Sequence, residues 1–258
     1  GIVLTNAGVV FRDRAKHVLR ELDRAQLEVK AMSRSPGGRI DFGMPFSISQ
    51  ALTRILVQRA HEDLPNVSLR VIDGWTGFII EWLVAGRLDL GVIYDHTLTS
   101  DLLHTELLAT EEQFLVCRRG DPLAGRQSIS LAEVAELPLV LPSREHGLRI
   151  AVEQIMQTIG REPRIQTEFE SIVGLRQSAE AGGVYTILPR GEVGEDLAAG
   201  RATIIRIVDP PIHRTLFLAW SNERPITPQM KTVIEIAKDE TAQIIKKGLW
   251  ATKFLGGQ

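Results

Sequence analysis

The sequence predicts an α/β protein built from two doubly wound units, preceded by a long N-terminal helix. Three observations predict this fold. Short apolar segments alternate with helical segments after residue 38. Apolar side chains in the first 36 residues repeat at coiled-coil spacing, and the length of 258 residues exceeds that of a usual single domain.

The N-terminal segment has the pattern of a seam helix, which Thr5 or Asn6 can cap. Its apolar or small side chains are spaced alternately by four and three residues, at Phe11, Ala15, Val18, Leu22, Ala25, Val29 and Met32. A helix of about 30 residues is ~45 Å long, and alone it cannot bury so narrow a stripe. We therefore expect residues 1–36 to self-associate. The alternative is that this helix folds onto its own domain.

The following region predicts a βαβαβ unit. Strands are expected at 39–44, 67–73 and 88–94, and the last is almost continuously apolar, as in a parallel strand covered on both faces. Helices are expected at 45–61, where Ser47 and Gln50 have the spacing of a capping box, and at 74–86.

A second round of strands and helices follows. Strands are expected at 113–118, 137–141, 164–169, 184–188, 203–207 and 215–220. Helices begin at the capping box of Ser130 and Glu133, at 147 and at 171, and the last runs from Thr227 and Pro228 to about residue 246. This alternation predicts two α/β units with parallel sheets, formed by one chain that crosses between them.

Composition and charge exclude several classes of protein. With 44% hydrophobic and 24% charged residues, the chain is expected to be soluble and globular. No apolar run approaches the ~20 residues of a membrane helix, and no secretory signal is visible. The single cysteine, Cys117, fits a reducing cytoplasm. A net charge of −2 argues against a self-sufficient nucleic-acid-binding surface.

The motifs of common catalytic and cofactor sites are absent from the sequence. It contains no GxGxxG after a strand, no phosphate-binding loop, no GxSxG and no HExxH. The six histidines show no metal-ligand spacing, and Cys117 lies in an apolar strand pattern, where a buried hydrophobic role is expected. We therefore expect no enzyme activity, no cofactor and no metal.

Helix starts offer a different kind of site. In open α/β sheets, ligands bind beyond the carboxyl ends of the strands, where helix N-termini carry unpaired N–H groups that suit anions. Each hydroxyl at such a start could be only a helix cap, but together they predict a cleft between two lobes. These hydroxyl residues are Ser47, Ser49, Thr76, Ser143 and Ser171. Apolar walls and a charged partner are expected from Phe46, Trp75, Tyr94 and either Arg144 or Arg149.

Motifs along nearly the whole chain resemble those of bacterial LysR-type transcriptional regulators. LTNAG at residues 4–8, followed by a long helix, resembles the end of the winged helix-turn-helix and the linker helix of that family. The segments GGRIDFGMPFS, AGRLDLGVI with Asp89, EEQFLVCRRGDPLA and GGVYTILPRG resemble its regulatory domain.

The resemblance implies two Rossmann-like subdomains of the periplasmic-binding-protein type. Subdomain I would comprise residues 38–111 and 218–258, subdomain II residues 112–217, and the linker helix residues 1–36. Together with the helix starts, it implies a small anionic or polar effector between the subdomains. The expected effector residues are Pro45, Phe46, Ser47, Thr76, Tyr94, Pro142, Ser143, Arg144 and Ser171.

The resemblance also implies partners. The protein would act in the cytoplasm as a homodimer or homotetramer, and it would contact DNA only through the N-terminal winged helix-turn-helix, which this fragment is expected to lack. Two other classes stay open. A solute-binding protein of a transporter would share the two lobes, but it needs an export signal and has no use for the N-terminal helix. An enzyme would be recognised by turnover of the ligand bound in the cleft.

Overall fold

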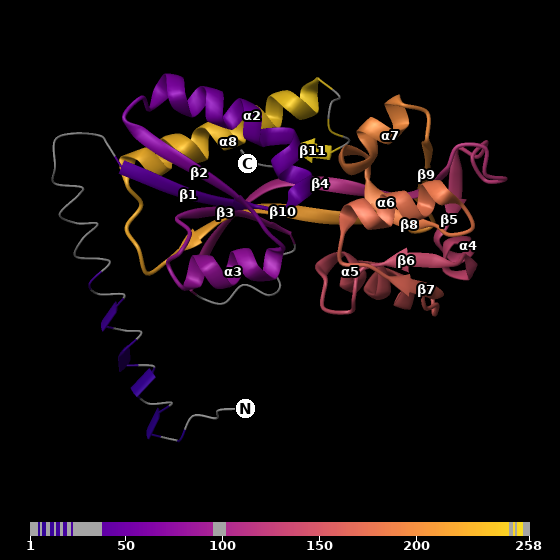
Figure 1. Cartoon of the computed structure of the whole chain (residues 1–258), viewed down its shortest axis with the longest axis horizontal. Helices are drawn as coiled ribbons and strands as arrows, with labels where there is room; N and C mark the ends of the chain where they lie inside the picture. Colours follow the sequence, from indigo (N-terminus) through magenta and orange to yellow (C-terminus); the bar gives the residue numbers. More distant parts are fainter. Residues whose placement is uncertain are drawn as a thin grey trace.

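The structure, a computed structural model, describes residues 5, 7–8, 11–12, 14–15, 18–19, 22, 38–94, 102–247, 250 and 252–254. Its elements form two units, which lie side by side in Figure 1. The first unit contains β1 (Gly38–Met44), α2 (Phe46–Asp63), β2 (Val67–Asp73), α3 (Thr76–Val84), β3 (Leu90–Tyr94), α8 (Pro228–Lys246) and β11 (Thr252–Phe254).

The second unit is built from shorter elements. These are β5 (Ser128–Ser130), α4 (Leu131–Glu136), β6 (Leu139–Leu141), α5 (Gly147–Gln157), β7 (Ile165–Glu168), α6 (Ile172–Ala181), β8 (Thr186–Pro189), the 3-10 helix η2 (Arg190–Val193), α7 (Gly194–Ala198) and β9 (Ala202–Val208). Two long strands, β4 (Leu103–Arg118) and β10 (Ile212–Ser221), run through both units and connect them.

The described strands form a large mixed sheet and a small parallel one. The large sheet has the order β2-β1-β3-β10-β4-β9-β5, and β8 and β11 also pair with β4. In it, β1 is parallel to β2 and β3, whereas β10 is antiparallel to β3 and β4. β6 and β7 form the small sheet.

The α/β class predicted from the sequence is confirmed, but the prediction of wholly parallel sheets is wrong. β4 is antiparallel to β8, β9, β10 and β11, and it begins at Leu103 rather than at residue 113. The chain leaves the first unit along β4 and returns along β10. Because these two strands carry the chain in opposite directions, they pair as antiparallel neighbours.

Each unit has its own hydrophobic core. In the first unit, α2 and α8 pack on one face of the sheet and α3 packs on the other. An added Cβ at Gly91 of β3 would lie 2.7 Å from Cγ2 of Ile79, so α3 approaches β3 at a distance that only glycine allows. The core of the second unit gathers buried residues from β4, β9 and the helices α4 to α6, among them Leu115, Val152 and Ile205.

Several predicted helix caps are present. Thr5 Oγ1 accepts a hydrogen bond from the backbone N–H of Gly8 at 3.1 Å. Ser130 and Glu133 form the predicted capping box at the start of α4. Thr227 caps α8, which has proline in its first turn. These caps depend on residues three positions apart, so the sequence alone predicts them well.

The capping box predicted for Ser47 and Gln50 is wrong. α2 begins at Phe46, after Pro45, without a hydrogen bond from a side-chain cap. Ser47 therefore lies inside the first turn, and its hydroxyl is 2.9 Å from the hydroxyl of Tyr94. The Ser47 hydroxyl thus contacts Tyr94, which is distant in sequence, instead of capping the helix as the local pattern predicted.

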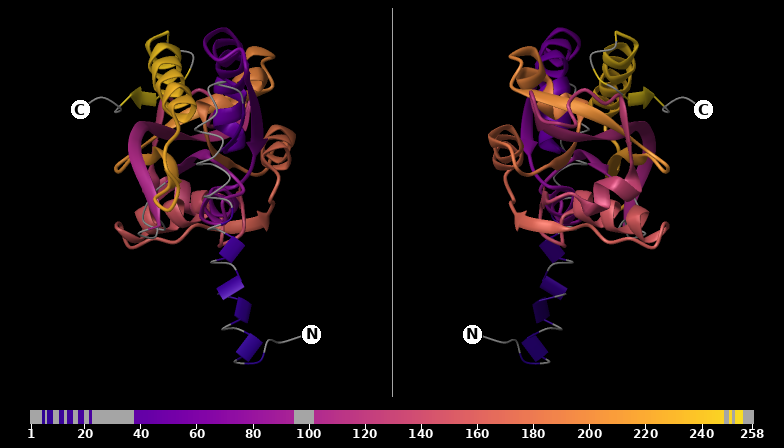
Figure 2. Two further views of the ribbon diagram at one scale, coloured as in Figure 1. Left: turned by 90° about the vertical axis from the view of Figure 1, so that its left-hand side faces the viewer. Right: turned by 90° about the vertical axis from the view of Figure 1, so that its right-hand side faces the viewer.

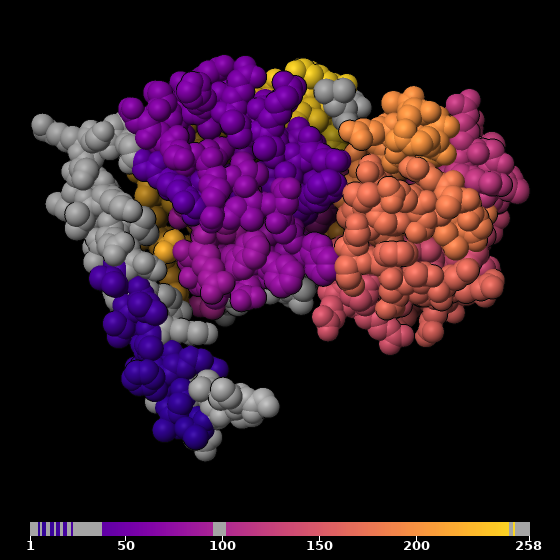
Figure 3. All heavy atoms as spheres, in the orientation of Figure 1, coloured from indigo at the N-terminus to yellow at the C-terminus, as the bar shows by residue number. Residues whose placement is uncertain are grey.

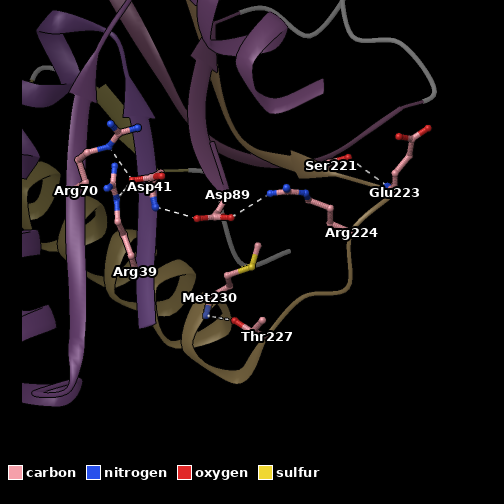
Figure 4. A network of polar contacts seen from close by, with 9 residues as sticks. All are labelled: Arg39, Asp41, Arg70, Asp89, Ser221, Glu223, Arg224, Thr227 and Met230. Atoms are coloured by element: carbon pink, nitrogen blue, oxygen red, sulfur yellow. Dashed lines mark hydrogen bonds and ion pairs between the residues drawn. The ribbon is translucent and has the colours of Figure 1, made fainter. Parts of the chain in front are cut away.

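Asp89, part of the motif that carried the family resemblance, belongs to a polar network at the amino end of β3 (Figure 4). Its carboxylate accepts the backbone N–H of Asp41 at 2.9 Å and lies 3.4 Å from the guanidinium of Arg224. The side chains of Arg39 and Arg70 both reach Asp41 at 2.7 Å. The network ties β1, β2 and the segment after β10 together, so Asp89 has a structural role.

The described residues between Ala7 and Leu22 are helical and project from the body of the molecule (Figure 2). The side chains of Phe11, Val18 and Leu22 are 76%, 66% and 55% exposed. The other described seam residue, Ala15, is partly exposed, and the predicted seam positions Ala25, Val29 and Met32 lie outside the described residues. In the part of the chain that the structure describes, no helix has the length and apolar character needed to cross a membrane.

Candidate functional site

A cavity of about 310 Å³ lies where the two units meet. The first unit lines it with the starts of α2 and α3 and the end of β3, and the second with the start of α5 and with η2. Gln113 of β4, Ile172 of α6, Pro189 of β8 and Arg214 of β10 also line it. Figure 3 shows the outer boundary along which the two masses touch. Residues of both units therefore surround one space.

Aromatic side chains form one wall of the cavity. The rings of Trp75 and Phe78 stack with their centroids 5.9 Å apart, and His146 meets Trp75 edge-on at 5.2 Å. Because Trp75 precedes α3 and His146 caps α5, this contact joins the two units across the cavity. Burial and the nearby charge of Arg214 lower the pKa of His146 to about 4, so its ring is neutral at pH 7.

The floor is a buried hydrogen-bond network centred on Glu111. The Tyr94 hydroxyl donates to Glu111 Oε2 at 2.6 Å, and Trp250 Nε1 donates to Oε1 at 2.5 Å. The amide of Gln113 lies 3.5 Å from Oε2, and Ser47 joins the network through Tyr94 at 2.9 Å. Burial raises the pKa of Glu111, and the hydrogen bonds from Tyr94 and Trp250 oppose that rise.

A second buried carboxyl group, Glu192, lines the cavity from η2. Burial and the charge of Glu111 raise the pKa of Glu192 to about 8, although Ser47 and Arg214 act in the opposite direction. The guanidinium carbon of Arg214 lies 3.8 Å from the centre of the Tyr94 ring, in cation–π geometry. The two units thus bring acidic, basic and aromatic groups together around one cavity.

The structure brings together five of the nine effector residues predicted from the sequence. Pro45, Phe46, Ser47, Thr76 and Tyr94 all line the cavity. Thr76 Oγ1 accepts the backbone N–H of Tyr94 at 3.2 Å, which holds the start of α3 against the end of β3. These five come from the first unit, where helix starts directly follow strands.

The other four predicted residues, all from the second unit, do not line the cavity: they are Pro142, Ser143, Arg144 and Ser171. Ser171 caps α6 by accepting the N–H of Gly174 at 3.2 Å, and the backbone N–H of Ser143 donates to a carboxylate at 3.1 Å. Arg144 is exposed, and the carbonyl of Pro142 accepts from the buried Arg149. Each of these contacts lies within the second unit.

Gln113, His146, Glu192 and Arg214 are lining residues that sequence reasoning missed. The available signal was a charged side chain near the start of a largely apolar strand, as at Arg214 of β10; Gln113 follows two glutamates in β4, where no such contrast marks it. Cys117 is buried in β4, as predicted, and burial raises the pKa of its thiol to about 11. Among the described residues, no group of three His, Cys, Asp or Glu side chains could hold a metal ion.

A family model matches most of the chain. Residues 33–242 match the model described as the LysR substrate binding domain. This chain belongs to the LysR substrate-binding domain family. The match confirms the family resemblance that the sequence motifs indicated, and it covers both of the units that line the cavity.

Relatives of this LysR-family chain are regulators. It is 29% identical over 237 residues to the nitrogen assimilation regulatory protein nac of Klebsiella aerogenes, covering 92% of this chain and 76% of the relative. It is 26% identical over 253 residues to the HTH-type transcriptional regulator BbuR of Bordetella bronchiseptica, covering 97% and 77%.

Solved structures share the fold. HinK, a LysR family transcriptional regulator from Pseudomonas aeruginosa, has a TM-score of 0.73 at 22% identity, with 93% of this chain and 82% of that chain covered. The effector binding domain of QuiR in complex with shikimate has a TM-score of 0.72 at 22% identity, with 80% and 98% covered. At this identity the comparison concerns the fold alone.

Proposed function

We propose that this chain is the effector-sensing and oligomerisation region of a bacterial LysR-type DNA-binding transcriptional regulator. The observation that carries the proposal is the cavity, because both units line it and Trp75 touches His146 across it. The family match and the regulator relatives support it. A solute-binding protein of a transporter is therefore not retained, since these relatives are transcriptional regulators.

The proposed subdomains follow the two hydrophobic cores. Subdomain I comprises residues 38–111 and 218–258, and subdomain II comprises residues 112–217. The division is supported by one core that draws on Ile40 to Ala109 and Leu216 to Trp250, and by another that draws on Leu115 to Ile212. A ligand that contacts both subdomains would stabilise one relative arrangement of them, and this shift in population is the proposed signal.

The cleft binds its ligand without chemical change in this proposal. Ser47 is the hydroxyl that an acyl-transfer mechanism would need, but its partner at 2.9 Å is the Tyr94 hydroxyl, and the neighbouring Glu192, with a pKa of about 8, is protonated at pH 7 and is not a base there. The described lining also contains no cysteine or lysine. Recovery of a bound compound unchanged after long incubation is the expected result, and a new product would make the cleft an active site.

The N-terminal segment, residues 1–36, pairs with a second copy of the chain in this proposal, as a dimer or as part of a tetramer in the cytoplasm. The exposed Phe11, Val18 and Leu22 support it. DNA contact belongs to a separate winged helix-turn-helix of the whole regulator. Sedimentation at micromolar concentration should show more than a 28.6 kDa species. Leu22→Asp should weaken that assembly, whereas a wild-type protein that sediments as a monomer would contradict it.

A cavity-filling variant tests the effector cleft. Gly77 lines the cavity, and no atom lies within 4 Å of the position its Cβ would take, so Gly77→Leu adds bulk to the cavity without a clash at Cβ. Gly194→Leu is the matched control, because Gly194 is also helical and open but lies outside the cavity. Small polar molecules are screened by thermal shift against all three proteins. Compounds that stabilise the wild type and Gly194→Leu, but not Gly77→Leu, support the cleft; a screen without any such compound counts against it.

A further inference from the structure

The hydroxyl hydrogens of Tyr94 and Ser47 already take part in hydrogen bonds within the protein. The hydroxyl hydrogen of Tyr94 is donated to Glu111 at 2.6 Å, so Tyr94 has no second hydrogen for Ser47. The one hydroxyl hydrogen of Ser47 is therefore used inside the protein, toward Tyr94 at 2.9 Å or toward Glu192, whose pKa a hydrogen bond from Ser47 lowers. What Ser47 can still offer a ligand is the lone pairs of its oxygen.

Two further groups in the lining have buried oxygen atoms without a hydrogen-bond partner. Gln113 is 1% exposed and Glu192 is 6% exposed, and both line the cavity. The amide nitrogen of Gln113 faces Glu111, whereas its Oε1 has no hydrogen-bond partner, and neither has Oε2 of Glu192. A buried acceptor without a partner is costly, so these two oxygens are expected to be satisfied by a bound group.

The charge of the lining also favours a ligand that is a cation and a hydrogen-bond donor. At about pH 8.5, above the pKa of about 8 that burial and the charge of Glu111 give to Glu192, the described lining carries three carboxylates, those of Glu81, Glu145 and Glu192, against the one guanidinium of Arg214. Arg214 already faces Tyr94 at 3.8 Å, and its charge lowers the pKa of the buried Glu111. An anion would therefore meet an excess of negative charge, whereas a cation would be attracted.

We propose that the ligand of this cleft carries a cationic hydrogen-bond donor, an ammonium or amidinium group, on a flat apolar body. The cationic group lies against Glu192, Gln113 and the oxygen of Ser47, and the flat body lies against Trp75 and Phe46. The inference rests on the effector cleft proposed above and names the chemical class of its ligand. The sequence predicted an anionic or polar ligand, and this inference departs from the anionic alternative because the lining holds more carboxyl groups than guanidinium groups.

Three probes of similar size separate the head groups. Benzylamine, benzyl alcohol and benzoate share an aromatic ring, and calorimetry measures their binding to the wild-type chain at about pH 8.5, where the amine keeps its proton. Benzamidine extends the test to an amidinium. We expect the two cations to bind at least about tenfold more tightly than benzoate.

The variant Glu192→Gln keeps the size of the side chain and removes its charge. It should weaken benzylamine binding by about ten- to a hundredfold and leave benzyl alcohol nearly unchanged. Glu145→Gln, at an exposed position of the same cavity, is the matched control and should change benzylamine binding by less than about threefold.

Three results would overturn the inference: tighter binding of benzoate, unchanged benzylamine binding in Glu192→Gln, or no binding of either cation at about 10 mM. None of them would remove the effector cleft itself. That proposal fails only when the screen with Gly77→Leu finds no compound that depends on the cavity.

Discussion

Replacement of Glu192 by glutamine should make the protein more stable, by an amount that grows with pH. Burial and the charge of Glu111 raise the pKa of Glu192 to about 8, whereas 4.5 is the ordinary value for a glutamic acid. Between these two values the folded chain holds a proton that the unfolded chain releases. The wild type therefore loses stability as pH rises through this window, and the glutamine variant, which does not titrate, does not share that loss.

The size of the effect follows from the same two values. One pKa unit corresponds to about 1.4 kcal/mol, so the wild type should lose about 3 kcal/mol relative to Glu192→Gln between pH 5 and pH 8. That is a large share of the ~5–15 kcal/mol that stabilise a typical domain. Glu111 is present in both proteins, so its own titration largely cancels in the difference.

Urea denaturation of both proteins at pH 5, 6, 7 and 8 measures this difference at each pH. Glu81→Gln, which removes an exposed carboxyl group from the same cavity, controls for the loss of one negative charge. A difference in unfolding free energy between wild type and Glu192→Gln that stays constant across this range would refute the reasoning. It would mean that Glu192 reaches water or a counter-charge in the folded protein.

Three further changes have defined outcomes. Gly91→Ala should destabilise the protein by about 1–3 kcal/mol in urea, because its Cβ would lie 2.7 Å from Ile79, whereas Gly194→Ala, at an open helical position, should stabilise it by about 0.4–1 kcal/mol. Equal effects of the two substitutions would contradict the packing argument. Cys117 should react with a thiol reagent only after unfolding, since burial raises the pKa of its thiol to about 11; rapid modification of the native protein would disprove this. Thr227→Ala should cost about 1 kcal/mol through loss of the α8 cap, and an unchanged denaturation midpoint would exclude that role.

Local patterns predicted the fold of the first unit closely. The expected strands at 39–44 and 67–73 agree with β1 and β2 to within one residue, because apolar alternation and turn residues mark their ends. The 16-residue strand β4 was predicted only in its last third. Its first part carries charged residues such as Glu106 and Glu112, which hide a strand from a search for apolar runs. Pairing with β10, about a hundred residues later, makes it a strand.

The candidate site was predictable in its first half only. Ser47 and Thr76 follow strands directly, so the geometry of an α/β unit predicts where they lie. Glu192 and Arg214 are brought to the cavity by η2 and by the return strand β10, and their burial depends on groups far along the chain. A local sequence pattern cannot predict such long-range contacts. For this reason the sequence predicted Ser143 and Arg144 as the second-unit residues of the site, rather than Glu192 and Arg214.

The antiparallel pairing of β4 and β10 makes the second unit one continuous insertion in the chain, whose two ends lie side by side. Glu112 pairs with His213 and Gln113 with Ile212, so the chain enters and leaves that unit through neighbouring positions of one antiparallel ladder. A block swapped between two such regulators would need only these two adjacent junctions. The chimaera would keep Ser47, Trp75 and Phe78 of the recipient and would receive the donor's counterparts of His146 and Glu192. Ligand preference in this architecture can thus be exchanged by grafting one continuous stretch of sequence.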